Sequence, residues 1–337
     1  MSRRIVLQQR PEGLPTPACF RIEDVPDRPL AEGEVRLATL YLSLDPYMRG
    51  RMSEGPSYVE PVPVGEVMCG GAVSRVVESR AAALQPGDYV LGDTGWQDAP
   101  VVPAAGLVKL ERGRTPLSWA LGVMGMPGLT AYVGLLDIGQ PKPGETVVVA
   151  AATGAVGAIV GQIARLKGCR VVGIAGGADK CDYAVRELGF DACVNHHDDD
   201  LPQRLAAACP KGIDVYFENV GGHVLLAVLP LLNLNARMPV CGVIAWYNLT
   251  GLPAGPDFTP MLMRTVLVRR VTMKGFIIFD HQHRLADFAQ HMSDWLAEGR
   301  IKYHEDVVEG LEQAPQALIG LLQGANFGKL VVRVGKE

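Results

Sequence analysis

The spacing of apolar and polar positions changes character near Pro127-Gly128. Before that point, short apolar runs are separated by turns rich in Pro and Gly, and long helical periodicity is absent. The runs predict strands, which are Arg4–Gln8, Val35–Tyr41, Gly71–Val77 and Tyr89–Leu91. Residues 1–125 are therefore expected to form a β-rich domain.

After that point, strand-like apolar runs alternate with helical segments. The predicted strands are Thr146–Ala151, Arg170–Ala175, Ala192–Asn195, Val215–Glu218, Arg237–Cys241 and Thr272–Ile278. The predicted helices lie near Val156–Lys167, Lys180–Leu188, Leu201–Ala208 and Val224–Leu229, with an amphipathic one at Leu285–Glu298. This alternation predicts an α/β fold with a doubly wound parallel sheet over residues 126–302. Residues 303–337 show a strand–helix–strand pattern and are expected to return to the first domain.

A glycine-containing turn follows the first strand of the alternating region. Its residues, Ala152 to Gly157, have the spacing of G-x-G-x-x-G, with Ala152 in the place of the first glycine. Gly154 would let the backbone approach a pyrophosphate, and Gly157 would let the following helix pack close to the strand. Since a second strand follows at Arg170–Ala175, the context predicts a dinucleotide site. The plain alternative is a buried strand, turn and helix without a ligand.

The end of that second strand bears on the choice of dinucleotide. It reads Ala175-Gly176-Gly177, where an NAD-specific fold would place a carboxylate for the ribose hydroxyls. Asp179 is close but is expected to cap the next helix. Lys180 lies within reach of a ribose 2′-phosphate, so the pattern favours NADP over NAD; alternatively, Lys180 is only a solvated first-turn lysine.

Composition and charge argue against a nucleic-acid-binding or membrane-spanning protein. The chain has 32 Lys and Arg against 36 Asp and Glu, a formal net charge of −4, so no surface for nucleic acid is expected. No apolar stretch is long enough to cross a bilayer, and we expect no signal peptide. The seven cysteines form no C-x-x-C pair, which indicates free thiols and favours the cytoplasm.

The distribution of histidine and cysteine argues against a catalytic metal. All seven histidines follow residue 195, and the predicted β-rich domain offers only Cys19 and Cys69. Alcohol oxidation would then lack its usual Lewis acid. Hydride transfer to a carbon–carbon double bond conjugated to a carbonyl stays feasible, because one hydroxyl or backbone donor can hold the enolate oxygen.

Several segments together resemble one known family. They are Ser43–Met52, Gly125–Tyr132, Ala151–Gly157, Glu218–Gly222 and Asn326–Lys329. The chain resembles the zinc-independent medium-chain dehydrogenases/reductases, and within them the alkenal/alkenone double-bond reductases. The resemblance implies a GroES-like β domain, a Rossmann domain, NADPH in the cleft between them, and a homodimer.

The resemblance also implies site residues. The pyrophosphate turn would be Thr153, Gly154, Ala155 and Val156, and the 2′-phosphate lysine would be Lys180. The residues on the nicotinamide side would be Asn219, Cys241, Gly242, Tyr247, Phe276, Ile278 and Asn326. Some relatives carry a tyrosine after the asparagine of the third strand, where this chain has His196. His196 either contacts the adenosine phosphate or is a solvated histidine at the end of the strand.

Two phenols are candidates for the chemistry. Tyr247 follows the fifth strand, and such strand ends line the ligand crevice of doubly wound sheets, so its hydroxyl could hold an enolate or relay a proton. Tyr47 is a second candidate; either one could instead only pack. The expected activity is NADPH-dependent reduction of the double bond of α,β-unsaturated ketones and aldehydes. The alternatives are a zinc-free quinone oxidoreductase and a non-catalytic NADPH-binding sensor or structural protein.

Overall fold

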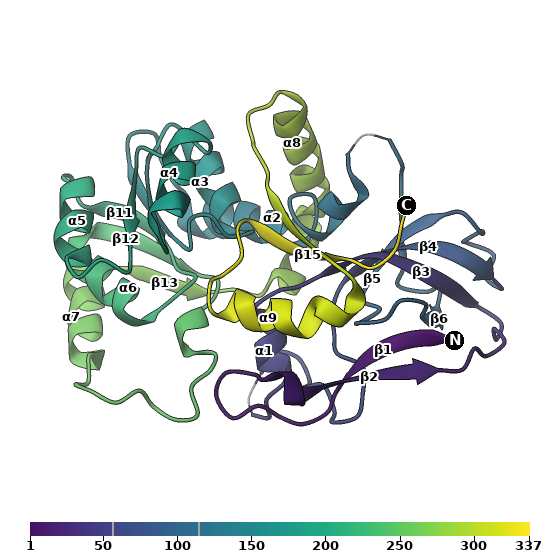
Figure 1. Cartoon of the computed structure of the whole chain (residues 1–337). Coiled ribbons are helices and arrows are strands. Elements are labelled where there is room, and N and C mark those ends of the chain that lie inside the picture. The colour runs from purple at the N-terminus through teal and green to yellow at the C-terminus, as the bar shows by residue number, and fades with distance from the viewer. Residues whose placement is uncertain (56, 114) are drawn as a thin grey trace. The chain divides into compact units, whose positions relative to one another are not determined.

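The chain forms two compact units in a computed structural model that describes residues 1–55, 57–113 and 115–337 (Figure 1). Unit 1 consists of Met1–Gly122 together with Glu305–Glu337, and unit 2 consists of Val123–His304. Unit 2 is therefore inserted into unit 1, whose two parts come from opposite ends of the chain.

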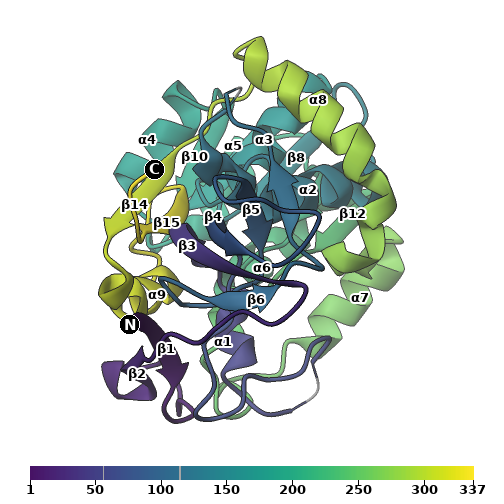
Figure 2. The ribbon, with the colours of Figure 1, turned by 90° about the vertical axis from the view of Figure 1, so that its right-hand side faces the viewer.

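Unit 1 is built around a seven-stranded sheet, most of which is visible in Figure 2. Its strands follow the order β14-β15-β3-β4-β5-β7, with β6 paired to β3, and β1 and β2 form a separate pair. The strands are β1 (Ser2–Leu7), β2 (Phe20–Val25), β3 (Glu34–Ser43), β4 (Ala72–Ser79), β5 (Tyr89–Gly92), β6 (Val101–Pro103), β7 (Val108–Leu110), β14 (Glu305–Glu309) and β15 (Lys329–Arg333). The helices are α1 (Tyr47–Arg51) and α9 (Ala314–Leu322). The expected β-rich fold of this part is confirmed.

A buried ion pair joins the two parts of unit 1. The Lys329 ammonium at the start of β15 donates to Ser43 Oγ at 2.6 Å, to the Leu44 carbonyl at 2.8 Å and to Asp45 Oδ1 at 2.8 Å. The side chains of Lys329 and Asp45 are only 1% and 8% exposed. With three acceptors, the ammonium is paired and hydrogen-bonded, which burial of a charge requires.

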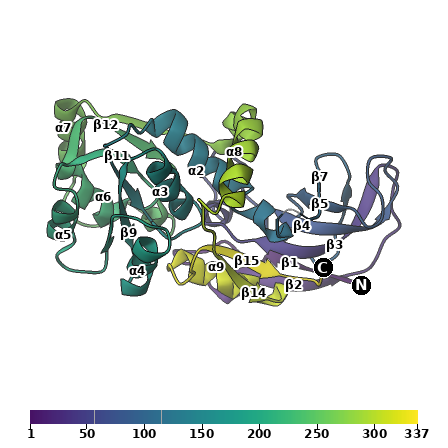
Figure 3. The same cartoon turned by 90° about the horizontal axis from the view of Figure 1, so that it is seen from above.

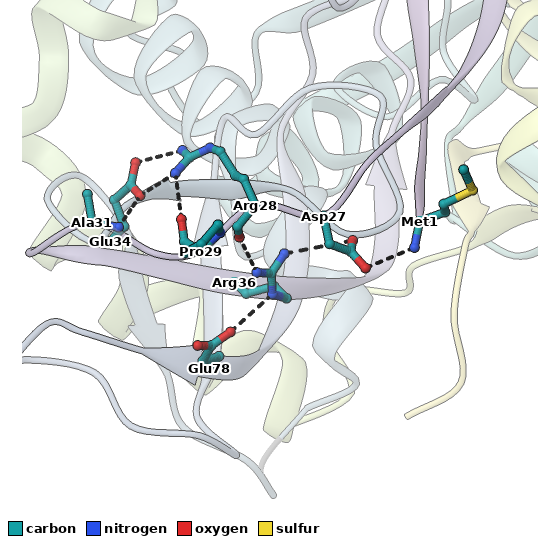
Figure 4. A network of polar contacts seen from close by, with 8 residues as sticks. All are labelled: Met1, Asp27, Arg28, Pro29, Ala31, Glu34, Arg36 and Glu78. Carbon is teal, nitrogen blue, oxygen red and sulfur yellow. Dashed lines mark hydrogen bonds and ion pairs between the residues drawn. The ribbon is translucent and has the colours of Figure 1, made fainter.

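An exposed network of charges holds the segment between β2 and β3 (Figure 4). The Met1 ammonium donates to Asp27 at 2.9 Å, and the Arg28 guanidinium donates to both oxygens of Glu34 at 2.7 Å. These bonds to Arg28 are the main cause that lowers the pKa of Glu34 to about 2. Because these groups face water, the network shapes the turn and adds little stability.

Unit 2 is a doubly wound α/β domain, as the alternating pattern predicted. Its six parallel strands follow the order β10-β9-β8-β11-β12-β13. They are β8 (Thr146–Ala150), β9 (Arg170–Ala175), β10 (Ala192–Asn195), β11 (Ile213–Phe217), β12 (Leu232–Val240) and β13 (Thr272–Gly275). The helices are α2 (Met126–Val133), α3 (Gly157–Leu166), α4 (Ala178–Arg186), α5 (Leu201–Ala208), α6 (Gly222–Val228), α7 (Thr259–Arg269) and α8 (Leu285–Ala297).

The helices of unit 2 cover both faces of this sheet (Figure 3). Helices α5, α6 and α7 pack on one face, where they share an apolar core with the strands, and α3 and α4 lie on the other face. The strand order reverses between β8 and β11, the two strands at the centre of the sheet. This switch point, at the carboxyl ends of β8 and β11, is where doubly wound sheets bind ligands.

Some sequence-based boundaries were wrong. The strand predicted at Thr272–Ile278 ends at Gly275, and a short 3-10 helix begins at Ile278. Asp179 does not cap α4: the cap position is Gly177, whose φ of 100° favours glycine, and Asp179 lies in the first turn. Helix α7 was not predicted, because none of its residues is fully buried and its apolar residues lie on both its packed and its exposed sides. Among the described residues, no helix is long and apolar enough to span a membrane.

Candidate functional site

The glycine turn lies where the sequence placed it, between β8 and α3. Ala151 has a left-handed backbone with φ of 51°, and the Gly154 amide donates to its carbonyl at 2.9 Å. A Cβ on Gly157 would lie 2.2 Å from the same carbonyl oxygen, whereas a Cβ on Gly154 would lie 3.3 Å from it. Glycine at 157 is therefore what allows α3 to begin so close to β8.

The missing first glycine of the motif has a structural explanation. Ala152 is buried, and its amide donates to the Ile174 carbonyl of β9 at 3.0 Å. Its methyl group lies against Gly173 of that strand, where an added Cβ would come within 2.8 Å of it. The space that the motif usually gains at its first position is supplied here by a glycine on the neighbouring strand.

The turn is a suitable cradle for a pyrophosphate. Thr153, Gly154, Ala155 and Val156 all lie between the end of β8 and the N-terminus of α3. A helix N-terminus favours anions through its amide groups and its dipole, and Gly154 leaves room for the backbone to come close. The structure therefore fits a dinucleotide here, although the contacts of these four residues with it stay predictions.

Two further segments lie at the carboxyl end of the sheet beyond β9 and β10. The side-chain oxygen of Asn195 accepts from the Gly177 amide at 2.8 Å and from the His197 amide at 3.2 Å. This bridge connects the turn before α4 to the loop after β10, and Lys180 lies in the first turn of α4. A Cβ on Gly176 would come within 3.0 Å of His196 Nε2 and 3.1 Å of His197 Nε2.

The loop after β11 is organised by a buried carboxylate. Glu218 Oε1 accepts from the amides of Val220 at 2.6 Å and Gly221 at 2.8 Å. Burial raises the pKa of Glu218, and the two amides partly oppose that shift. The Asn219 amide donates to the Ala150 carbonyl at 2.8 Å, so its side chain bridges the ends of β11 and β8 beside the glycine turn.

The segment after β12 is paired with this loop. The amides of Cys241 and Gly242 donate to the Glu218 carbonyl at 2.9 Å and 3.2 Å. Burial raises the pKa of the Cys241 thiol to about 12, which favours the protonated thiol at neutral pH. The Tyr247 hydroxyl accepts from the Val243 amide at 3.3 Å.

Tyr247 needs a glycine beneath it. A Cβ on Gly242 would come within 3.0 Å of the Tyr247 oxygen. The phenol is thus folded back over residues 242–243, at the same end of the sheet as Asn219. The structure brings these two candidates together with the glycine turn in unit 2.

The other candidates have different surroundings. A Cβ on Gly134 would lie 2.6 Å from the Phe276 ring, so that ring packs against the junction after α2, and Ile278 is buried. Tyr47 begins α1 in unit 1, where burial raises the pKa of its hydroxyl far above the usual range. Asn326, also in unit 1, donates to the Gly328 carbonyl at 2.8 Å. Cofactor contacts by Phe276, Ile278 and Asn326 stay predictions.

Two contributors to this end of unit 2 were missed from the sequence. Glu218 was noticed only as part of a motif, and the burial that gives it a structural role has no local sequence signal. His223 lies 27 residues after His196, yet its ring is 5.5 Å from it. Among the described residues, no group of three or more His, Cys, Asp or Glu side chains is arranged to hold a metal ion.

Known proteins match both units. Residues 3–110 match a family described as N-terminal domain of oxidoreductase, and residues 155–298 match one described as zinc-binding dehydrogenase. The NADPH-dependent curcumin reductase of Escherichia coli is 60% identical over 337 residues, which cover 100% of this chain and 98% of that protein. The NADP(+)-dependent 2-alkenal reductase of Nicotiana tabacum is 40% identical, with 100% and 98% covered.

A solved structure shows the same fold. The crystal structure of CurA from Vibrio vulnificus in complex with NADPH superimposes with a TM-score of 0.96 at 56% sequence identity, covering 99% of this chain and 100% of that one. The expected GroES-like and Rossmann fold class is thereby confirmed. Matched along its full length by reductases of this kind, the chain belongs to the medium-chain dehydrogenases/reductases, in the alkenal/alkenone double-bond reductase branch.

Proposed function

We propose that this protein uses NADPH to reduce the carbon–carbon double bond of α,β-unsaturated ketones and aldehydes. The observation that carries the proposal is the 60% identity, over the full length, to an NADPH-dependent curcumin reductase. The match to a 2-alkenal reductase supports the same bond type, because both substrates place a double bond next to a carbonyl.

The residues of unit 2 fit NADPH. The cradle at Gly154 and Gly157 suits the pyrophosphate, and the turn Ala175–Gly177 has only alanine and glycine where an NAD site would place a carboxylate. Lys180, in the first turn of α4, would pair with that phosphate. When bound, NADPH would supply a hydride to the β-carbon of the substrate.

The chain's own groups would then handle the charge that develops on the substrate. Tyr247 would donate its phenolic proton in a hydrogen bond to the enolate oxygen, since an oxyanion is stabilised by a donor already held in place. The Val243 amide fixes the position of that hydroxyl. Proton delivery to the α-carbon would come from Tyr247 or from water. Tyr47 of unit 1 is retained as a second candidate donor.

Replacing Tyr247 with phenylalanine tests this role. Tyr247→Phe removes one donor and keeps the ring, so the loss is expected mainly in kcat, because the oxyanion exists chiefly in the transition state. Loss of one oxyanion donor costs about 2.7–4 kcal/mol elsewhere, and we expect a smaller loss where other donors share the charge. Steady-state kinetics with a good enone measures it.

A matched substitution provides the control. Tyr89→Phe changes a half-buried phenol on β5 of unit 1 and should leave kcat unchanged. An unchanged kcat for Tyr247→Phe, with hydride transfer shown to limit the rate by a deuterium isotope effect, would make Tyr247 a residue that only packs. Deuterium from the cofactor should appear at the β-carbon, and deuterium from solvent at the α-carbon.

The function as a whole is tested with a panel of substrates. Enones, enals and quinones are offered with NADPH, and loss of the nicotinamide absorbance is followed. We expect turnover of enones and enals. Turnover of quinones alone would instead identify a quinone reductase, and tight NADPH binding without any turnover would identify a binding protein.

We also propose that two copies form a homodimer through the edge of the unit 2 sheet. All four residues of β13 are exposed at the sheet's edge, and α7, which leads into it, exposes Met263 and Leu267. An exposed edge strand invites pairing with another chain. A second copy would offer the same strand and the same apolar helix, which suits a twofold interface.

Placing a charge on this surface tests the dimer. Leu267→Asp puts a carboxylate at a position that is 78% exposed in the single chain, and we expect the mass in sedimentation equilibrium to fall from two chains to one. Val108→Asp, on an exposed residue of unit 1, serves as the control and should keep the dimer. A wild-type mass of one chain at micromolar concentration would contradict the proposal.

For the location, we propose the cytoplasm. The seven cysteines are free thiols in the structure, although Cys181 and Cys193 lie with their sulfur atoms 2.8 Å apart. Neighbouring thiols of this kind persist in a reducing compartment.

A further inference from the structure

Three histidine rings gather at the carboxyl ends of β9 and β10, and we refer to His196, His197 and His223 as the histidine cluster. The ring of His196 is 4.1 Å from that of His197 and 5.5 Å from that of His223, centre to centre. Two of the rings come from the loop after β10 and the third from the first turn of α6. Elements distant in the sequence thus bring three imidazoles to one place.

The cluster faces the turn that precedes α4. A Cβ added to Gly176 would lie 3.0 Å from Nε2 of His196 and 3.1 Å from Nε2 of His197, so both rings lie against this turn. A side chain at 176 would crowd both nitrogens, so the glycine lets the imidazoles approach the turn closely. The bridge through Asn195 holds the same two segments together.

The hydrogen bonds of the cluster leave it able to accept protons. His223 Nε2 lies 3.1 Å from the His196 carbonyl, and because a carbonyl only accepts, this nitrogen carries a proton and Nδ1 is the basic atom. His196 Nδ1 is buried and has no hydrogen-bond partner among the residues that the structure describes. Burial, followed by the neighbouring His197 and His223, lowers the pKa of His196 to about 4.

The neighbouring side chains that lower the pKa of His196 are all basic. They are His197 on its own loop, His223 on α6 and Lys180 on α4. The nearest acidic group along the chain, Asp198, is already engaged: it accepts from Asn195 Nδ2 at 2.7 Å and pairs with Arg204 at 3.3 Å. Like charges around a buried imidazole keep it neutral until an anion arrives.

We propose that the histidine cluster reads the 2′-phosphate of NADPH in a proton-coupled way: when the phosphate binds, the cluster takes up a proton, so discrimination against NADH grows as the pH falls. The inference rests on the proposed use of NADPH. A dianionic phosphate beside Gly176 and Lys180 would reverse the local balance of charge and stabilise an imidazolium. His196, His197 and His223 are then specificity-determining residues.

The expected direction follows from proton linkage. An imidazole that is neutral in the free protein and charged in the complex makes affinity rise as the pH falls through its pKa in the complex and on toward its lower pKa in the free protein. The effect should appear between about pH 8.5 and pH 7. It should level off near about pH 6, where the phosphate itself takes up a proton.

Binding of two nucleotide fragments tests the inference without any turnover. Adenosine 2′,5′-bisphosphate carries both phosphates, and 5′-AMP lacks the 2′-phosphate. By titration calorimetry of the wild-type protein, we expect affinity for the bisphosphate to rise about three- to fivefold from about pH 8.5 to pH 7. The affinity for 5′-AMP should stay flat. Repeating the titration in buffers of different ionisation enthalpy should reveal proton uptake with the bisphosphate only.

Substitutions of the three histidines test which of them take up the proton. His196→Gln, His197→Gln and His223→Gln should each reduce the uptake and flatten the pH dependence, whereas His283→Gln, at an exposed histidine of the same unit, should change neither. The inference is wrong if bisphosphate binding is strong but independent of pH, or if proton uptake survives all three substitutions. Either result would leave the proposed use of NADPH intact. Equal affinity for the two fragments would overturn the use of NADPH as well, and the substrate panel reports separately on enone reduction.

Discussion

Gly157→Ala is expected to destabilise unit 2 and to abolish tight binding of NADPH. The added methyl group would lie 2.2 Å from the Ala151 carbonyl oxygen and 2.9 Å from its carbon, both of them backbone atoms that cannot rotate away. Alanine favours a helix over glycine by about 1 kcal/mol, but overpacking costs about 1–3 kcal/mol and sometimes more. Because backbone atoms must move here, the cost of the clash exceeds the gain in helix propensity. We expect the free energy of unfolding to fall by about 2 kcal/mol or more.

Thermal unfolding and cofactor titration measure this result. For a domain of this size, such a loss lowers Tm by roughly 4–8 °C. Gly154→Ala is the matched control, because its methyl group would lie 3.3 Å from the same oxygen, a contact that a small shift relieves. It should spare Tm and still weaken NADPH binding by crowding the phosphate. An unchanged Tm for Gly157→Ala would show that α3 can start farther from β8.

The second large effect concerns the choice between the two dinucleotides. Lys180→Ala is expected to raise the KM for NADPH about ten- to a hundredfold and to leave the use of NADH nearly unchanged. A charge-assisted hydrogen bond contributes about 1.5–3 kcal/mol, and only the cofactor with the 2′-phosphate can form it. Initial rates with each cofactor at saturating enone measure the ratio.

Lys211→Ala, at an exposed lysine of the same unit, is the control for the loss of one positive charge. It should change neither KM. Should Lys180→Ala raise both KM values alike, Lys180 would act on the fold of α4 and not on the phosphate, and the preference for NADPH would have to come from other groups.

The strands of unit 2 could be predicted because their buried residues form continuous runs in the sequence. The residues of β8 are all buried, so the run Thr146–Ala150 is recognisable without any partner. Helix α7 has only half-buried residues on its packed side, and all four residues of β13 are exposed, so their sequences carry only a weak inward pattern. The packing partners of these two elements are distant in the sequence. For that reason α7 was missed, and the strand at β13 was predicted to be too long.

Some features of the candidate site have a local sequence signal, and others depend on elements distant in the sequence. The glycine turn is local, and its spacing alone predicted where it would lie. The role of Glu218 depends on two amides beyond it and on burial that comes from the whole sheet. The histidine cluster joins the loop after β10 to α6, and the parallel strand order, not the sequence spacing, sets that contact.

The insertion of unit 2 into unit 1 has a consequence for synthesis. Strand β15 lies inside the unit 1 sheet, between β14 and β3, and Lys329 supplies the cation for the buried Asp45. A growing chain can complete unit 2 once residue 304 has left the ribosome, but the first 122 residues can complete their sheet only after residues 305–337 have been made. Until β15 is made, the Asp45 carboxylate lacks its cation and the edge of β3 that pairs with β15 is open, so we expect unit 1 to fold after unit 2 during synthesis.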